Sequence, residues 1–178
     1  KVDNHLYMFC GANMSAYQVL ITGANRGIGL EFTKQYAADG WKVLACCREP
    51  QSASALQAIA NANSNVRIFT LDVAHFSQID ALALKLKDEA IDLLINNAGV
   101  YPHSSFGDTN YDDWAKAFKI NSMATLKMAE AFVQHITRSN LKKIATLTSK
   151  MGSIDDNTSG ESYSYRSTKT AVNMVMKS

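Results

Sequence analysis

The sequence predicts an α/β fold, with a doubly wound parallel sheet in three α/β/α layers. Short β-rich runs alternate with helical patterns along the chain, and this alternation is typical of stacked βαβ units. No repeat, low-complexity tract or proline-rich linker divides the pattern. The length of 178 residues suits one domain. We expect that domain to span residues 15–178, and we interpret residues 1–14 as a leader or tag, because Met14 lies just before the first strand pattern.

The first predicted strand covers residues 17–21 and leads through a glycine-rich turn into a helix at 27–38. Gly40 follows this helix and ends it, since glycine is the usual residue just past a helix C-terminus. The apolar residues that share one face of the helix are Ile28, Phe32 and Tyr36.

The next two strands are predicted at residues 42–47 and 66–71. The first of them contains Cys46 and Cys47, which we expect to be small core residues. A helix near 54–61 joins the two strands, with its apolar positions at Leu56, Ile59 and Ala60. After the third strand a full i, i+3, i+4, i+7 stripe predicts another helix, and the stripe consists of Ile79, Leu82, Ala83 and Leu86.

The fourth strand is predicted at residues 91–95 and is followed by a loop at 96–108. A long helix then runs to about residue 137. We predict Thr109 as its N-cap, because Asp112 stands three residues later in a capping-box arrangement.

The fifth strand is predicted at residues 143–148, and a polar stretch at 149–162 separates it from a last helix. Right-handed crossovers arrange the five strands in the order 3-2-1-4-5. The chain therefore predicts a Rossmann-like sheet whose C-terminal strands are absent. Ligands of such sheets bind beyond the carboxyl ends of the strands, and the polar motifs fall at these ends or on helices beside them.

The overall composition excludes several classes of protein. With 47% hydrophobic and 19% charged residues, the chain is too apolar for a disordered protein and too mixed for a membrane bundle. A net charge of +2 supplies no strong field for nucleic acid or a lipid surface. The three cysteines lack the spacing of a disulfide framework, and the four histidines lack that of metal ligands. We therefore expect a cytoplasmic, metal-free protein.

The turn after the first strand reads Thr22-Gly23-Ala24-Asn25-Arg26-Gly27-Ile28-Gly29. Its glycines permit positive φ and leave no Cβ to keep a pyrophosphate from the amides at the helix N-terminus, where peptide dipoles favour an anion. The spacing differs from G-x-G-x-x-G. Its place between a strand and a helix nevertheless favours a phosphate-binding turn over an ordinary tight turn.

Arg48 stands at the end of the second strand, where the common NAD signature places an acid that accepts both ribose hydroxyls. Its guanidinium group, together with that of Arg26, would instead pair with a 2′-phosphate, which favours NADP(H) over NAD(H). The alternative for Arg48 is a solvated residue that begins a loop. Asp72, after the third strand, either accepts a hydrogen bond from an adenine amino group or caps its own loop.

Tyr165 and Lys169 are four residues apart, which puts them on one face of a helix. A neighbouring ammonium group and a nicotinamide cation favour the phenolate form of a tyrosine. Such a phenol can donate its proton to a carbonyl oxygen while hydride arrives at the carbon, or accept a proton in the reverse reaction. Tyr165 is therefore a candidate general acid and base, although a tyrosine and a lysine at this spacing also occur by chance and the pair alone does not establish the role.

Two further polar residues are candidates for the same chemistry. Ser149 stands at the end of the fifth strand, where its hydroxyl can polarise the reacting oxygen. The alternative is a turn or cap serine, and other nearby hydroxyls belong to Thr148, Ser153 and Ser164. Asparagine is a poor mid-helix residue. Asn121 is therefore either an exposed polar position or the site of a backbone kink that holds water for a proton relay to Lys169.

These motifs occur in a fixed order, and together they resemble the short-chain dehydrogenase/reductase family over about residues 16–178. The matching segments are Thr22-Gly23 with Gly27 and Gly29, Asp72-Val73, Asn96-Asn97-Ala98-Gly99, Asn121, Ser149 with Gly152, and Tyr165 with Lys169. Within the family, the segment from Tyr165 to Lys169 after an insertion at 157–160 is similar to sniffer-type carbonyl reductases and bacterial C-factor-like proteins.

The resemblance implies roles for individual residues. A catalytic tetrad would consist of Asn121, Ser149, Tyr165 and Lys169, with Lys169 favouring ionisation of Tyr165 and holding the nicotinamide ribose. The implied cofactor-binding residues are Gly23, Asn25, Arg26, Gly27, Ile28, Gly29, Arg48, Asp72, Val73, Asn97, Ala98, Gly99, Tyr165 and Lys169. Many members pair subunits through the long helix and the Tyr/Lys helix, so we expect a homo-oligomer, a dimer or tetramer, of the full-length form.

The chain also departs from the family pattern. The interval between Ser149 and Tyr165 is longer than in many members, so the insertion must loop outward if Ser149 is to reach the site. The family continues past residue 178 with further strands and a loop that closes over the substrate.

The sequence thus predicts an NADPH-dependent oxidoreductase that transfers hydride between nicotinamide and a carbonyl or alcohol substrate, with no nucleic-acid or membrane partner. The alternatives are a nucleotide-binding signalling or regulatory module without turnover and an inactive fragment of a reductase. The sequence does not identify the substrate. Three loop side chains are candidates to line its site: Tyr101, His103 and Phe106.

Overall fold

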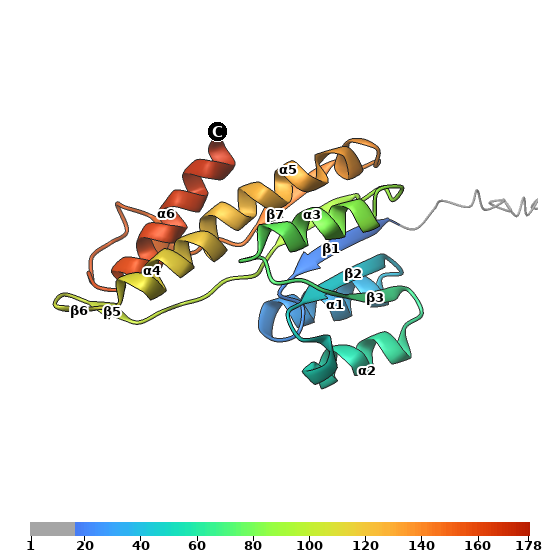
Figure 1. Cartoon of the computed structure of the whole chain (residues 1–178), viewed down its shortest axis with the longest axis horizontal. Helices are drawn as coiled ribbons and strands as arrows, with labels where there is room; N and C mark the ends of the chain where they lie inside the picture. Colours follow the sequence, from blue (N-terminus) through green and yellow to red (C-terminus); the bar gives the residue numbers. More distant parts are fainter. Residues whose placement is uncertain (1–16) are drawn as a thin grey trace, which may run out of the picture.

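The computed structural model describes residues 17–178, which form a parallel sheet between two layers of helices (Figure 1). The strand order is β3-β2-β1-β4-β7, which confirms the predicted order 3-2-1-4-5. These strands are β1 (Gln18–Thr22), β2 (Lys42–Cys47), β3 (Val66–Thr70), β4 (Leu93–Asn96) and β7 (Lys143–Thr146). The leader predicted at residues 1–14 lies outside the described residues.

Helices cover both faces of this sheet, as the alternation of patterns predicts. The α-helices are α1 (Gly27–Ala38), α2 (Ser54–Ala62), α3 (Phe76–Lys85), α4 (Tyr111–Phe118), α5 (Ala124–Thr137) and α6 (Tyr163–Lys177). Shorter helical turns are η1 (Pro50–Ser52), η2 (Lys119–Met123) and η3 (Lys150–Gly152). Within residues 17–178, none of the helices has the length and apolar character needed to cross a membrane.

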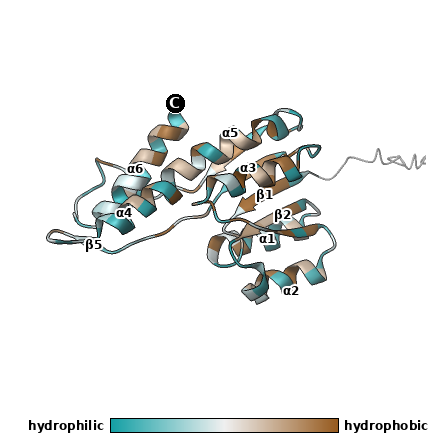
Figure 2. Cartoon of the chain, viewed as in Figure 1, coloured by the Kyte–Doolittle hydropathy of each residue, from teal (hydrophilic) through white to brown (hydrophobic). Residues whose placement is uncertain are grey.

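The central strands are buried on both faces, and successive residues alternate between two cores. In β1, Val19 and Ile21 belong to the core under α1 and α2, whereas Leu20 belongs to the core under α3 and α5. The central strands are accordingly brown in Figure 2, the colour of hydrophobic residues. Cys46 and Cys47 are buried in opposite cores, as predicted, and burial raises the pKa of both thiols.

Helix α1 has its predicted bounds but not its predicted apolar face. The side that is fully buried consists of Gly29, Thr33 and Ala37, whereas Ile28 is 61% exposed. Phe32 and Tyr36 are half-buried. Small residues occupy the buried side because the helix lies very close to the turn after β1. The prediction that Ile28 belongs to the buried face is therefore wrong.

The loop predicted at residues 96–108 contains an antiparallel hairpin of β5 (Ser104–Ser105) and β6 (Asp108–Thr109). Phe106 in its turn is 93% exposed. His103 lies beside the hairpin, with its Nε2 atom 3.4 Å from an Asp108 carboxylate oxygen. Both side chains are therefore placed by the hairpin, which projects from the end of the molecule in Figure 1.

The long helix predicted at 109–137 is divided into α4, the π-helical turn η2 and α5. The predicted N-cap, Thr109, is wrong. Asn110 caps α4, and its side-chain oxygen accepts hydrogen bonds from the backbone N–H groups of Asp112 (3.0 Å) and Asp113 (3.1 Å). The Thr109 hydroxyl instead donates to the Ser105 carbonyl at 2.9 Å, because Thr109 belongs to the hairpin that the sequence did not reveal.

Candidate active site

A cavity of about 280 Å³ lies at the carboxyl ends of β1, β2 and β4, where the sheet topology switches direction. All predicted cofactor residues line it except Gly29, Tyr165 and Lys169. Four lining residues were not identified from the sequence: Cys47, Leu71, Val100 and Ile120. Cys47 ends β2 and Leu71 follows β3. Their positions at the carboxyl ends of strands could have identified both from the sequence.

The glycine turn brings the backbone to the edge of this cavity. Gly23 has φ of +65°, and a Cβ there would lie 3.0 Å from Cα of Ala98. A Cβ at Gly29 would lie only 2.3 Å from the Gly23 carbonyl oxygen. The missing Cβ at Gly23 therefore lets the turn lie against Ala98, and the missing Cβ at Gly29 lets α1 approach the turn.

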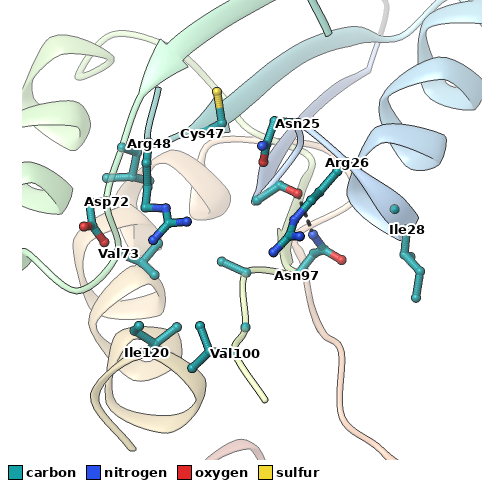
Figure 3. A pocket seen from close by; sticks show the side chains of 15 residues that line it. Asn25, Arg26, Ile28, Cys47, Arg48, Asp72, Val73, Asn97, Val100 and Ile120 are labelled. Atoms are coloured by element: carbon teal, nitrogen blue, oxygen red, sulfur yellow. Dashed lines mark hydrogen bonds between the residues drawn. The ribbon is translucent and has the colours of Figure 1, made fainter. Parts of the chain in front are cut away.

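Hydrogen bonds tie the turn to the segment that follows β4. The Asn97 side chain donates to the carbonyl oxygens of Thr22 at 2.8 Å and of Gly23 at 3.0 Å. Figure 3 shows the Asn97 side chain at the cavity. In return the Thr22 hydroxyl accepts from the backbone N–H groups of Asn97 and Ala98, both at 3.0 Å. These hydrogen bonds thus join the ends of β1 and β4, which form one wall of the cavity.

Two arginines supply the positive charge of the cavity. Figure 3 shows the guanidinium groups of Arg26 and Arg48 reaching into it from opposite sides. Among residues 17–178, neither forms an ion pair with a carboxylate. Guanidinium groups without a protein anion are suited to bind a phosphate.

Asp72 serves its own loop as well as lining the cavity. One carboxylate oxygen accepts from the Ala74 N–H at 2.9 Å, and the other lies 3.2 Å from Nδ1 of His75. The loop-capping interpretation of Asp72 is therefore observed. Asp72 also lines the cavity, and its contact with an adenine amino group stays a proposal.

Tyr165 and Lys169 lie together on α6. The Lys169 Nζ atom is 5.7 Å from the centre of the Tyr165 ring and donates to the Leu147 carbonyl at 2.7 Å. A Cβ at Gly99, which lines the cavity, would lie 4.0 Å from the same Nζ atom. Lys169 is 6% exposed, and this burial lowers the pKa of its ammonium group. The predicted pair therefore shares one face of α6, and Lys169 lies beside the cavity at Gly99.

Asn121 is 2% exposed and lies in the π-helical turn, so the interpretation as an exposed polar position is wrong. Its side-chain amide donates to the Val100 carbonyl (2.9 Å) and the Thr168 hydroxyl (3.0 Å). Its oxygen accepts from the Val100 N–H at 2.9 Å. π-helical turns occur often at functional sites. Here the turn directs a buried amide that joins α6 to the segment after β4.

Ser149 accepts a hydrogen bond from the Met151 N–H at 3.2 Å, and so it caps the short helix η3. That helix packs directly on α6, since a Cβ at Gly152 would lie 2.9 Å from the Lys169 carbonyl oxygen. The other hydroxyl candidates have partners of their own: Thr148 bonds Asn173, Ser153 accepts from Asp156 N–H, and Ser164 bonds Ser104.

Comparisons with known proteins agree with this arrangement. Residues 17–178 match the family model described as short chain dehydrogenase. The protein C-signal of Myxococcus xanthus is 38% identical over 99 residues, which are 55% of this chain and 60% of that protein. The chain spans about two thirds of the length of the first three curated relatives it matches.

Solved structures of two carbonyl reductases are also similar. The NADPH-bound carbonyl reductase from chicken fatty liver has a TM-score of 0.82 and 33% identity, over 90% of this chain and 71% of that chain. The carbonyl reductase Sniffer of D. melanogaster has a TM-score of 0.82 and 27% identity, over 91% of this chain and 73% of that chain.

Proposed function

The chain belongs to the short-chain dehydrogenase/reductase family, as its motifs predict, and we propose that it is an oxidoreductase that transfers hydride between NADP(H) and a carbonyl or alcohol substrate. The observation that carries this proposal is the contact between the ring of Tyr165 and Lys169, whose Nζ atom lies beside the cavity residue Gly99. The cavity itself holds two guanidinium groups that pair with no carboxylate within residues 17–178.

The cavity fits a dinucleotide with a 2′-phosphate. A Cβ at Gly27 would meet no atom within 4 Å, so the N-terminus of α1 offers open space and N–H groups for the pyrophosphate. Arg48 and Arg26 would hold the 2′-phosphate, and Asp72 with Val73 would border the adenine. The similar chicken carbonyl reductase, which was solved with NADPH bound, supports this assignment.

The bound nicotinamide supplies or accepts the hydride, and the chain supplies the proton. In the reductive direction the Tyr165 hydroxyl donates its proton to the substrate oxygen, and in the oxidative direction the phenolate accepts it. The Lys169 ammonium favours the ionised phenol and would hold the nicotinamide ribose. The Ser149 hydroxyl donates a hydrogen bond to the same substrate oxygen. Asn121 fixes the position of α6 and holds water for a proton relay to Lys169.

Substitution of Tyr165 by phenylalanine tests the proposal. We expect Tyr165→Phe to lower kcat by a factor of about 10² to 10⁴, because the general acid is lost. Affinity for NADPH should persist. Turnover is measured as NADPH oxidation with an aromatic aldehyde, and affinity by fluorescence titration. Tyr163→Phe, on the same helix, should change neither quantity. Equal turnover in the Tyr165→Phe variant and the unmodified chain would refute the catalytic role.

A nucleotide-binding signalling module without turnover is the second candidate, favoured by the similarity to C-signal. Under that alternative Tyr165→Phe would leave biological activity intact. We further propose a homo-oligomer that uses the exposed apolar residues of the long helix, among them Met123, Leu126 and Val133. A cytoplasmic location is part of the proposal, since Cys46 and Cys47 are free thiols.

A further inference from the structure

The ring of Tyr165 has a second neighbour besides Lys169. The ring of Tyr101, from the segment after β4, lies with its centre 4.4 Å from that of Tyr165 and is tilted by 46°. Tilted aromatic pairs at this spacing are attractive and directional. Tyr101 is 57% exposed, so burial alone does not explain where its side chain lies.

Tyr101 is held from both ends. The residue before it, Val100, exchanges two hydrogen bonds with the buried side chain of Asn121, each 2.9 Å long. At the other end, the Tyr101 hydroxyl lies 2.7 Å from the Ser162 hydroxyl, in a hydrogen bond. Tyr101 is therefore held between the π-helical turn, through the backbone of Val100, and the residue that precedes α6.

Ser162 occupies an unusual backbone conformation. Gly160, Glu161 and Ser162 are three successive residues with positive φ, of 69°, 52° and 52°. The left-handed region is unfavourable for residues with a Cβ, and such backbone persists where surrounding contacts determine it.

Those contacts are present around the left-handed turn at residues 160–162. The Ser162 N–H donates to the Ser104 carbonyl at 2.9 Å, and Nε of Arg166 donates to the carbonyl oxygens of Gly160 (3.2 Å) and Glu161 (3.1 Å). The buried hydroxyls of Ser104 and Ser164 are 2.8 Å apart. The backbone at the start of α6 is thus fixed to the segment that carries Tyr101.

The Tyr165 hydroxyl, in contrast, forms no hydrogen bond within residues 17–178, so contacts with the ring itself must set its orientation. Lys169 and Tyr101 provide these contacts. We propose that Tyr101 is a positioning residue for Tyr165: its ring, anchored through Ser162, restricts rotation of the phenol. This inference rests on the proposed function, in which Tyr165 exchanges the proton.

Kinetics of four variants test the proposal with NADPH and 4-nitrobenzaldehyde. Tyr101→Leu should lower kcat about tenfold, since a misoriented catalytic group is costly, and leave KM for NADPH within about twofold. Tyr101→Phe keeps the ring and should restore kcat to within about threefold of the unmodified chain. Ser162→Ala removes the same hydrogen bond and should match Tyr101→Phe. Because the two changes remove one interaction, the double variant should be no slower than either.

Tyr111→Leu is the matched control. Tyr111 is 74% exposed and its ring stacks on Trp114 at 5.8 Å, so this change also removes an aromatic pair, but away from Tyr165. It should leave kcat unchanged. Equal kcat for Tyr101→Leu and the unmodified chain overturns the positioning role. If Tyr165→Phe abolishes turnover in the same assay, the proposed function survives that result.

An NMR measurement on the same chain is independent of turnover. With ring-labelled tyrosine, and with Tyr165 assigned by its loss in Tyr165→Phe, a nuclear Overhauser contact should join the rings of Tyr101 and Tyr165. Tyr101→Leu should shift the Tyr165 ring signal by removing the ring current, and Tyr101→Phe should largely preserve it. Absence of the ring contact, or an unchanged Tyr165 signal in Tyr101→Leu, overturns the inference even where turnover is not detected.

Discussion

The cavity at the strand ends and the proposed reaction centre on α6 are built in different ways. The cavity wall is largely backbone: a glycine turn, the strand ends and the short segment after β4, closed by two arginines. The reaction centre is assembled from side chains. Its side chains come from separate segments. Asn121 exchanges hydrogen bonds with Val100, Lys169 donates to the Leu147 carbonyl, and the ring of Tyr101 contacts that of Tyr165.

This difference determines how each region responds to substitutions. A backbone wall tolerates changes of side chain except where a Cβ would collide with it. A side-chain network loses several partners when a buried member such as Asn121 is removed, because each group left unsatisfied keeps its cost of burial. Substitutions in the two regions, followed by measurements of stability and of cofactor affinity, can therefore test this difference.

The largest effect should come from Gly29, where α1 touches the glycine turn. A Cβ there would meet the Gly23 carbonyl oxygen at 2.3 Å and the Asn97 side-chain nitrogen at 2.4 Å. We expect Gly29→Val to lower the free energy of unfolding by about 3 kcal/mol, measured by urea denaturation.

Gly27→Ala is the control for this prediction. A Cβ at Gly27 has no atom within 4 Å, so only its φ of +54° opposes substitution. It should cost about 1 kcal/mol. Equal losses in both variants would mean that the turn is limited by backbone conformation and not by its contact with α1.

Asn121→Ala should rank second and reveal the side-chain network. The change leaves both backbone groups of Val100 and the Thr168 hydroxyl without their partner. We expect a loss of about 2 to 3 kcal/mol in the free energy of unfolding. Asn140→Ala, at an exposed position, should stay within about 0.5 kcal/mol. A small loss for Asn121→Ala would contradict the importance of this bridge.

Arg48→Glu should weaken cofactor binding in the cavity and leave the stability of the fold unchanged. Loss of a charge-assisted pair with the 2′-phosphate should weaken NADPH binding about 10- to 100-fold. NADH lacks that phosphate and serves as the matched ligand, so its affinity should change little. Fluorescence titration measures both, and the melting temperature should stay the same because Arg48 is exposed. Tighter binding of NADH than NADPH by the unmodified chain would overturn the phosphate assignment.

The smallest effect concerns the start of α4, which leads into the π-helical turn. Asn110→Ala removes the observed cap and should cost about 1 kcal/mol. Thr109→Ala removes only the hydroxyl contact with the Ser105 carbonyl and should cost less. The order of the two losses, measured by thermal and urea unfolding, decides which residue caps the helix.

The strand order and most helix positions were predictable because they rest on periodicity and on right-handed crossovers. Helix α1 and strand β2 have their predicted bounds, and most other ends differ by a few residues. The cap at Asn110 was not predictable. Thr109 belongs to a hairpin, and the strands of that hairpin are only two residues long and leave no periodic pattern in the sequence. The buried face of α1 was not predictable either, since close packing favoured Gly29 over the larger Ile28.

The sequence by itself determined the layered α/β fold, the family and the elements that border the cavity, because each depends on short motifs and local periodicity. Only the tertiary structure decided that Asn121 is a buried bridge and that the rings of Tyr101 and Tyr165 meet. The physical reason is distance along the chain. Those contacts join residues that come together only after the sheet and its crossovers have formed, and no local pattern records which partner a side chain then finds.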